Sequence, residues 1–289
     1  SSDLEIDAKT RLTGLLGSPV AHSLSPVMHN TAFQCLGIPY CYMAFDVPER
    51  ALKTAVNGLK SLNARGWNVT MPDKTAMCAL VDQCSPAAAI IGAVNTVVNE
   101  GGILTGHMTD GSGFMKMLKE NRVTVAGETV VLCGAGGAAR AVAVQAALDG
   151  VKQLMIFNRS ESKAAALADT VNRNTPCRAE AYALADQKTL QTSLLDAALL
   201  INGTKLGMAP ETETRIIDTP QWLRPDMAVA DLVYHPRETR LLKMARSRGC
   251  QTLGGLGMLL FQGAQAFELW TGRAMPVSVV AKQVFHMEV

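Results

Sequence analysis

Lys74 has the position of a residue that transfers protons. It follows an apolar strand predicted over 66–70 and Pro72, and falls in the first turn of the next predicted helix. The helix dipole opposes a cation there, so the choice is between an ordinary solvated lysine and a general acid or base. Asp110, in the glycine-rich segment 106–113, is either a helix N-cap or a carboxylate that pairs with Lys74 at a cleft.

Ser23 and Ser25 form a second polar group, on the loop after a strand predicted over 11–16. Ser25 precedes Pro26, which predicts an N-cap followed by proline at the first position of a helix that runs to Leu36. The two hydroxyls at this helix start either cap the helix or bind a carboxylate, because hydroxyl and helix N–H groups converge there.

A Gly-x-Gly-x-x-Ala pattern at 134–139 predicts a phosphate-binding turn. It follows the apolar strand 129–133 and precedes an alanine-rich helix that ends near Asp149. Gly134 and Gly136 allow a sharp turn close to a pyrophosphate, which would face the helix N-terminus. A strand at 153–157 then leads to Asn158 and Arg159, where such folds read the adenosine ribose. The pattern favours a nicotinamide dinucleotide over a glycine turn that binds nothing.

Composition sets the limits of the protein class. The chain has 289 residues, 48% of them hydrophobic, and a net charge of +2, which suits two soluble domains and gives no reason to expect nucleic-acid or membrane partners. The seven cysteines form neither a zinc pattern nor a disulfide framework, so we expect no metal. The sequence lacks a signal-peptide core and an apolar run of ~18 residues, and we expect a cytoplasmic protein.

The other elements follow from apolar spacing. We expect strands over 40–47, 92–98, 198–202 and 228–233, and a helix over 49–62. A helix should begin near Phe114, and a long apolar one at Met258. Gln262 lies in this last helix, where an amide is more often a satisfied core group than a ligand.

Nine segments together resemble the shikimate dehydrogenase family, most closely its quinate/shikimate dehydrogenase branch. They occur in the family's order and span nearly the whole chain: 23–26, 68–74, 92–96, 109–113, 134–138, 158–159, 202–204, 231–236 and 257–262. The resemblance implies an α/β protein with an open N-terminal substrate domain and a Rossmann-type dinucleotide-binding domain. It places the substrate domain at 1–110, joined by a returning C-terminal helical segment at 257–289, and the Rossmann domain at 111–256.

The resemblance also implies the residue roles. Lys74 and Asp110 would form the catalytic pair that oxidises a ring alcohol to a ketone. The substrate, shikimate or quinate, would be held by Ser23, Ser25, Thr70, Asn95, Tyr234 and Gln262. The cofactor would be held by Gly134, Ala135, Gly136, Gly137, Ala138, Asn158, Arg159, Glu161, Lys163, Thr204 and Gly255.

Two positions bear on specificity. Glu161 favours the free ribose hydroxyls of NAD, while Arg159 and Lys163 could serve the extra phosphate of NADP, so we expect NAD with NADP tolerated. Met108 replaces the asparagine that is usual in the family before Thr109, and methionine cannot replace the hydrogen bonds of an amide. Thr70, bulkier than the serine sometimes found there, tilts the preference towards shikimate.

Two other functions fit the same residues. One is a family member that dehydrogenates a different polyol, as Met108 suggests. The other is a non-catalytic dinucleotide-binding metabolite sensor, although a sensor has no need of both Lys74 and Asp110. We expect no protein partner except a second copy in a homodimer.

Overall fold

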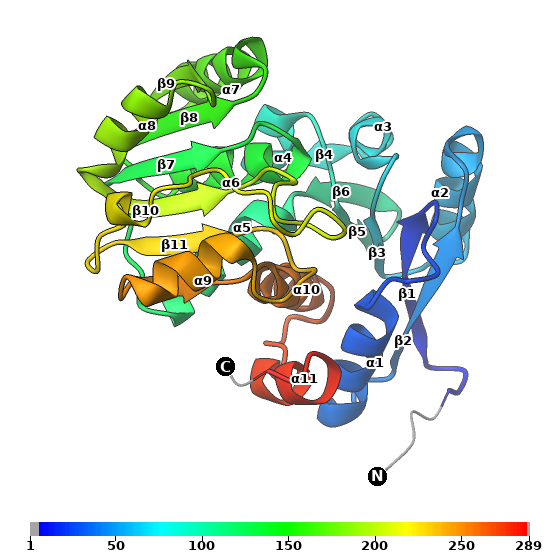
Figure 1. The fold of residues 1–289 in the computed structure, drawn as a ribbon. Coiled ribbons are helices and arrows are strands. Elements are labelled where there is room, and N and C mark those ends of the chain that lie inside the picture. The colour runs from blue at the N-terminus through cyan, green and yellow to red at the C-terminus, as the bar shows by residue number, and fades with distance from the viewer. Residues whose placement is uncertain (1–5, 288–289) are drawn as a thin grey trace. The chain divides into compact units, whose positions relative to one another are not determined.

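The computed structural model describes residues 6–287, which form two compact α/β units (Figure 1). One unit contains the chain up to Thr109 and again from Leu260 onward, and the other is Asp110–Leu259. Each unit is built on one six-stranded sheet. No helix in the described part of the chain is long and apolar enough to cross a membrane.

The sheet of the first unit is mixed. Its strands are β1 (Arg11–Gly17), β2 (Tyr40–Asp46), β3 (Gly66–Val69), β4 (Gln83–Cys84), β5 (Thr96–Glu100) and β6 (Ile103–His107), in the order β2-β1-β3-β5-β6-β4. Strand β1 is parallel to β2 and β3, β5 is antiparallel to β3 and β6, and β4 is parallel to β6. The carboxyl ends of β1, β3 and β6 and the amino end of β5 therefore share one edge.

Helices from both ends of the chain pack on this sheet. They are α1 (Ser25–Leu36), α2 (Leu52–Ser61), α3 (Lys74–Cys78), α4 (Pro86–Ile91), the later part of α10 (Gly255–Thr271) and α11 (Val277–Val284), with the 3-10 turn η1 (Glu49–Ala51) before α2. Trp270 near the end of α10 donates from Nε1 to the carbonyl of Val97 in β5 at 2.9 Å. Its own carbonyl accepts from Nε of Arg65 at 2.7 Å. These bonds fix the C-terminal helices to the N-terminal sheet.

His29 is a polar residue in the aromatic core of this unit. It is fully buried in α1, with its ring 4.5 Å from the ring of Tyr42 and 5.1 Å from that of Trp270. Neither ring nitrogen has a hydrogen-bond partner among the described residues. Burial lowers its pKa to about 3, so His29 stays neutral in the folded protein at ordinary pH.

His29→Leu should make stability less sensitive to acid. The unfolded chain takes up this proton near pH ~6.5 and the folded chain only near pH ~3, so His29 costs stability progressively as the pH falls between these values. From pH ~6.5 to pH ~4.5 the cost is about 2 kcal/mol. Urea unfolding of both proteins across this range measures it. A constant difference in unfolding free energy would contradict the prediction.

The sheet of the second unit is entirely parallel. Its strands are β7 (Thr129–Cys133), β8 (Gln153–Asn158), β9 (Arg178–Ala183), β10 (Ala197–Asn202), β11 (Ala228–Asp231) and β12 (Gln251–Leu253), in the order β12-β11-β10-β7-β8-β9. The helices are α5 (Thr109–Glu120), α6 (Gly137–Leu148), α7 (Glu161–Asn174), α8 (Gln187–Leu194) and α9 (Arg240–Ser247), with the 3-10 turn η2 (Pro220–Trp222). The chain leaves β7 towards β8 and β9 and later returns on its other side as β10. The switch point therefore lies between β7 and β10.

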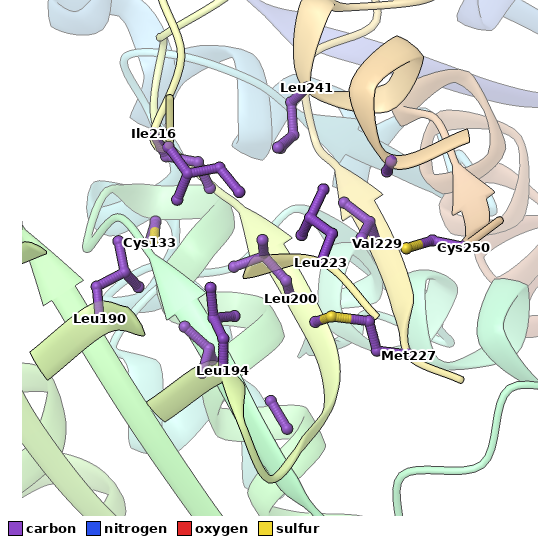
Figure 2. Close-up of a cluster of buried hydrophobic side chains, with 14 of the residues drawn as sticks. Cys133, Leu190, Leu194, Leu200, Ile216, Leu223, Met227, Val229, Leu241 and Cys250 are labelled. Atoms are coloured by element: carbon purple, nitrogen blue, oxygen red, sulfur yellow. The ribbon is translucent and has the colours of Figure 1, made fainter. Parts of the chain in front are cut away.

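A buried cluster holds α8 and α9 on this sheet. Leu190 and Leu194 of α8 and Leu241 of α9 pack with residues of the central strands, such as Leu200 and Val229 (Figure 2). Apolar runs buried on both faces are typical of parallel strands covered by helices. This is why the short runs at 129–133 and 198–202 could be identified as strands from the sequence.

Several predicted boundaries were wrong. Helix α5 begins at Thr109, not near Phe114, and includes glycines that had indicated a loop. A Cβ on Gly111 would lie 2.3 Å from the carbonyl oxygen of Ala141 in α6. The glycine at this position therefore allows the two helices to approach closely. Helix α10 begins at Gly255, not Met258. The weakly patterned edge strand β9 was not predicted.

Ser25 does not cap α1 as predicted. The N-cap is Leu24, which makes no side-chain capping bond, and Ser25 is the first helical residue. The side chain of Ser25 instead hydrogen-bonds that of Tyr42. The hydroxyl of Ser25 therefore bonds a residue of β2 and does not cap the start of α1, as local sequence had predicted.

Candidate functional site

Backbone hydrogen bonds join three loops at one edge of the first sheet. The amide of Ser18, after β1, donates to the carbonyl of Met71 at 3.2 Å. The amide of Val94, before β5, donates to the carbonyl of Lys74 at 2.9 Å. The amide of Val69 donates to the carbonyl of Asn95 at 2.8 Å. This edge therefore carries five residues predicted for the site, namely Ser23, Ser25, Thr70, Lys74 and Asn95.

A buried hydrogen-bond network runs behind this edge. Tyr42 donates from its hydroxyl to Oδ1 of Asn68 at 2.8 Å, and Nδ2 of Asn68 donates to Oγ1 of Thr96 at 2.9 Å. Thr96 contacts the hydroxyl of Thr109 at 3.0 Å, and the Thr109 amide donates to Oδ1 of Asn95 at 2.7 Å. The network thus fixes Asn95 and the residue immediately before Asp110.

Tyr42 extends this network to the other end of the edge. Its hydroxyl also hydrogen-bonds the side chain of Ser25, and burial raises the pKa of the phenol. Ser23 is tied in locally, because its Oγ accepts the amide of Ser25 at 3.2 Å. One chain of hydrogen bonds therefore links Ser25 to Thr109.

Tyr42 and Asn68 were not among the predicted site residues. Asn68 lies in one of the segments that resemble the family, and Tyr42 lies in the strand predicted over 40–47. The available signal was a polar residue between Trp67 and Val69 in a short strand that is buried throughout. A buried amide must find partners, so its position indicated a polar network.

Lys74 and Asp110 start their helices. Lys74 is the first residue of α3 and is half-buried, and Asp110 is half-buried in the first turn of α5. Asp73 precedes Lys74, is fully buried and has no hydrogen-bond partner for either carboxylate oxygen among the described residues. Burial, together with the charge of Glu49, raises the pKa of Asp73. Gln262 is buried in α10.

The glycine turn lies at the switch point of the second sheet. Gly134 has φ +120°, a left-handed backbone that favours glycine, and a Cβ there would lie 2.6 Å from the backbone carbon of Gly203. The amide of Gly203 donates to the carbonyl of Cys133 at 2.6 Å. The strand ends of β7 and β10 are therefore in backbone contact, and Gly134 is required by the fold itself.

The start of α6 fits a phosphate group. Gly136 has an extended backbone at φ −77°, and no side chain caps the helix. A Cβ built on Gly136 or Gly137 would meet nothing within 4 Å, whereas Ala135 is buried and Ala138 exposed. Open space before uncapped helix N–H groups is the arrangement that binds a pyrophosphate.

The end of β8 presents the residues predicted to read the ribose. Nδ2 of Asn158 donates to the carbonyl of Ser160 at 2.9 Å, which shapes the turn before α7. The side chains of Arg159, Glu161 and Lys163 are exposed around it. Both a carboxylate and two cations are thus available near the adenosine end of a dinucleotide.

The loops after β10 and β11 are fixed by Asp231. This buried carboxylate accepts from Oγ1 of Thr239 at 2.6 Å and from the Val233 amide and Nδ2 of Asn202, both at 3.0 Å. Burial outweighs these bonds and raises the pKa of Asp231 to about 6. Asn202 in turn accepts from the hydroxyl of Thr204 at 2.7 Å.

Tyr234 and Gly255 flank these loops. Tyr234 is 53% exposed, so its side chain is available to a ligand. Gly255 is buried, and a Cβ there would lie 2.5 Å from the carbonyl oxygen of Leu232. Close packing therefore explains why glycine stands at position 255, a reason that the sequence did not reveal.

A cavity of about 620 Å³ in this unit lies apart from the predicted residues. It is lined by the segment 212–220 and by residues 236–244 around α9. Its charges are largely matched within the wall, since Arg215 pairs with Asp218 at 2.6 Å and Arg240 pairs with Glu213. None of the predicted site residues lines this cavity.

The fold and the glycine turn define a class of protein. A parallel sheet with a glycine turn at its switch point is a Rossmann-type unit, and here it accompanies a second α/β unit with a polar edge. The predicted two-domain α/β fold is confirmed.

Comparison with known proteins shows the family. The family models described as "Shikimate dehydrogenase substrate binding domain", "Shikimate / quinate 5-dehydrogenase" and "Shikimate 5'-dehydrogenase C-terminal domain" match residues 15–97, 116–215 and 255–285. A curated shikimate dehydrogenase (NADP(+)) of Listeria monocytogenes is 46% identical over 97% of both chains. The chain belongs to the shikimate dehydrogenase family, as its motifs predicted.

Two solved structures are also similar. Shikimate 5-dehydrogenase from Listeria monocytogenes in complex with shikimate and NAD has a TM-score of 0.94 and 46% identity, covering 96% of this chain and 97% of that one. The ligand-free 5-ketofructose reductase of a Gluconobacter strain has a TM-score of 0.89 and 35% identity, covering 97% of this chain and 99% of that one.

Proposed function

We propose that this protein is an NAD(P)-dependent dehydrogenase that reversibly oxidises shikimate to 3-dehydroshikimate. The observation that carries the proposal is the hydrogen-bond network from Ser25 through Tyr42, Asn68 and Asn95 to Thr109. It aligns the residues predicted to bind one carboxylate with those predicted to bind ring hydroxyls. Residues 1–110 and 257–289 would hold the substrate and 111–256 the cofactor.

The polar edge suits a hydroxylated carboxylic acid. The hydroxyls of Ser23 and Ser25 would donate to the substrate carboxylate beside the start of α1. Thr70, Asn95 and Gln262 would bind ring hydroxyls, and exposed Tyr234 would line the cleft. Because Asn95 already accepts the Thr109 amide through Oδ1, its orientation is set before substrate arrives. This preorganisation lowers the entropic cost of placing the ring.

Lys74 is the residue that would accept the proton of the reacting hydroxyl. Its amine would take the proton as the alcohol becomes a ketone and return it in the reverse direction, with Asp110 orienting both groups. A bound nicotinamide dinucleotide supplies the hydride chemistry of this reaction. The chain contributes placement: the network behind Asn95 fixes Thr109, and Asp110 follows directly in the same helical turn.

The second unit fits a dinucleotide, and the choice between NAD and NADP belongs to the end of β8. The uncapped start of α6 would bind the pyrophosphate, with Gly134 to Ala138 forming the turn and Thr204 and Gly255 near the switch point. Glu161 is the basis for expecting NAD to be preferred. The curated relative is named for NADP(+), which does not favour that preference. Arg159 and Lys163 are the groups that would hold the extra phosphate of NADP.

The substrate has a second candidate. Met108 is buried at the point where the family usually has an amide, which removes one polar partner of the substrate loop. The similar Gluconobacter protein is named a 5-ketofructose reductase, so a polyol ketone is the alternative to shikimate. Quinate, a cytoplasmic location and a homodimer stay predictions.

Initial rates decide among these functions. Purified protein would be assayed for oxidation of shikimate and quinate with NAD and with NADP at mildly alkaline pH, and for reduction of 5-ketofructose with the reduced cofactors. Turnover of shikimate above quinate supports the proposal. Activity on 5-ketofructose alone supports the polyol reductase. Cofactor binding without turnover in any arm would indicate the metabolite sensor.

A further inference from the structure

Two thiols are in contact at the end of α3, the helix that begins with Lys74. Sγ of Cys78 and Sγ of Cys84 are 3.5 Å apart. Cys78 is the last residue of α3 and Cys84 the last of β4, and both are half-buried. The two cysteines are separated by only six positions, in a chain whose cysteine spacing had indicated no disulfide.

Both sides of this thiol pair are anchored. Cys84 stands opposite Gly106 in the parallel pairing of β4 with β6, and the next amide, of Ser85, donates to the Gly106 carbonyl at 2.8 Å. On the other side, the carbonyl of Lys74 accepts the Val94 amide at 2.9 Å. The framework thus holds the two sulfur atoms in contact, about 1.5 Å farther apart than the ~2.0 Å of a disulfide bond.

The two thiols interact directly. Burial raises the pKa of Cys84, and the hydrogen bond and charge of Cys78 raise it further. Either sulfur can donate the hydrogen bond that joins them, so either can attack an oxidant while the other resolves the product.

We propose that Cys78 and Cys84 are a site of reversible oxidation, where a hydroperoxide converts the thiol pair into an intramolecular disulfide. One sulfur of the pair attacks hydrogen peroxide, the O–O bond breaks, and a sulfenic acid and water form. The other sulfur then attacks the oxidised one, the S–O bond breaks, and the sulfenic oxygen leaves as a second water with the proton of the second thiol. The two thiols lose two hydrogens and two electrons in total, and a dithiol reductant reverses the reaction.

The disulfide would act on α3 more than on global stability. The closed loop is short, so the entropic stabilisation is small. Helix α3 has only five residues, and a shift of Cys78 is therefore passed to Lys74 at its other end. Resting on the proposed function, we expect oxidation to lower turnover at least about tenfold, because misplacing a reacting group by ~1 Å can cost ~100-fold.

Peptide mapping tests the site independently of activity. Trypsin releases residues 75–116 as one peptide, and Cys78 and Cys84 are its only cysteines. The intact protein would be treated with hydrogen peroxide, alkylated, denatured with more alkylating agent, and digested. We expect peptide 75–116 to be about 2 Da lighter than its reduced form and unalkylated until dithiothreitol is added. Full alkylation at both cysteines, or sulfinic acid without a disulfide, would overturn the proposal.

Variants separate the chemistry from the proposed function. Cys78→Ser and Cys84→Ser should each abolish the disulfide, and Cys35→Ser, at an exposed cysteine in α1, should not. Oxidation should lower turnover of the parent protein and of Cys35→Ser, reversibly, but not of the other two variants. A disulfide with unchanged turnover would refute the effect on Lys74. If the reduced protein turned over no substrate, the proposed function would fail while the peptide result still decided the disulfide.

Discussion

Lys74→Ala is expected to lower turnover of shikimate by at least about 100-fold, the range typical of a lost general acid or base. Dinucleotide affinity should hardly change, because Lys74 lies in the unit that contains β1 to β6 and the glycine turn lies in the other. Steady-state kinetics gives kcat, and quenching of tryptophan fluorescence by the reduced cofactor gives its dissociation constant.

Two further variants sharpen this test. Lys74→Arg keeps a cation and hydrogen-bond donors but cannot release a proton at ordinary pH, so it should be nearly as inactive as Lys74→Ala. Lys53→Ala, at an exposed lysine of α2, is the matched control and should retain parent activity. Substantial turnover by Lys74→Arg would mean that Lys74 only binds the substrate and does not transfer its proton.

The second large effect is a loss of cofactor affinity, and it is expected at only one of two glycines in the same turn. Gly136→Val should leave the fold intact, because its backbone is extended and a Cβ meets nothing within 4 Å. The added side chain would stand where the pyrophosphate is expected, so the dissociation constant for the dinucleotide should rise at least about tenfold, which is about 1.4 kcal/mol. Calorimetric titration with the cofactor measures this change, and thermal unfolding checks the fold.

Gly134→Ala is the matched contrast. At φ +120° with a Cβ 2.6 Å from the Gly203 backbone, alanine is strained and displaces β10, so this variant should lose thermal stability. Unchanged cofactor affinity in a well-folded Gly136→Val protein would mean that the start of α6 does not bind the pyrophosphate. Equal destabilisation by both substitutions would mean that Gly136 is structural too.

Some of this protein follows from local sequence. The strand, glycine turn and helix at 129–148 combine an apolar run, residues that tolerate a sharp turn and an alanine-rich segment, and these local properties suffice to specify a βα unit. Lys74 and Asp110 are predicted as catalytic candidates from their positions, after a proline and within a glycine-rich segment. The family followed from the order of short segments along the chain.

Other features depend on residues that are distant in sequence. The glycines of α5 indicated a loop in the sequence. The structure shows that Gly111 lies in a helix and packs closely against α6, and such packing cannot be recognised from the local sequence. Ser25 bonds Tyr42 and does not cap α1. Tyr42 belongs to β2, and nothing in the local sequence predicts that β2 and the start of α1 lie together.

The sequence by itself determined the family and the glycine turn, and it supplied the residues that we propose for proton transfer and cofactor binding, since these depend on residue type and local order. Only the tertiary structure decided that Tyr42 and Asn68 connect Ser25 to Thr109 and that Cys78 meets Cys84. Hydrogen bonds and thiol contacts act over ~3–4 Å, and only the assembly of the sheet and the packing of α1 and α3 bring these side chains within that distance.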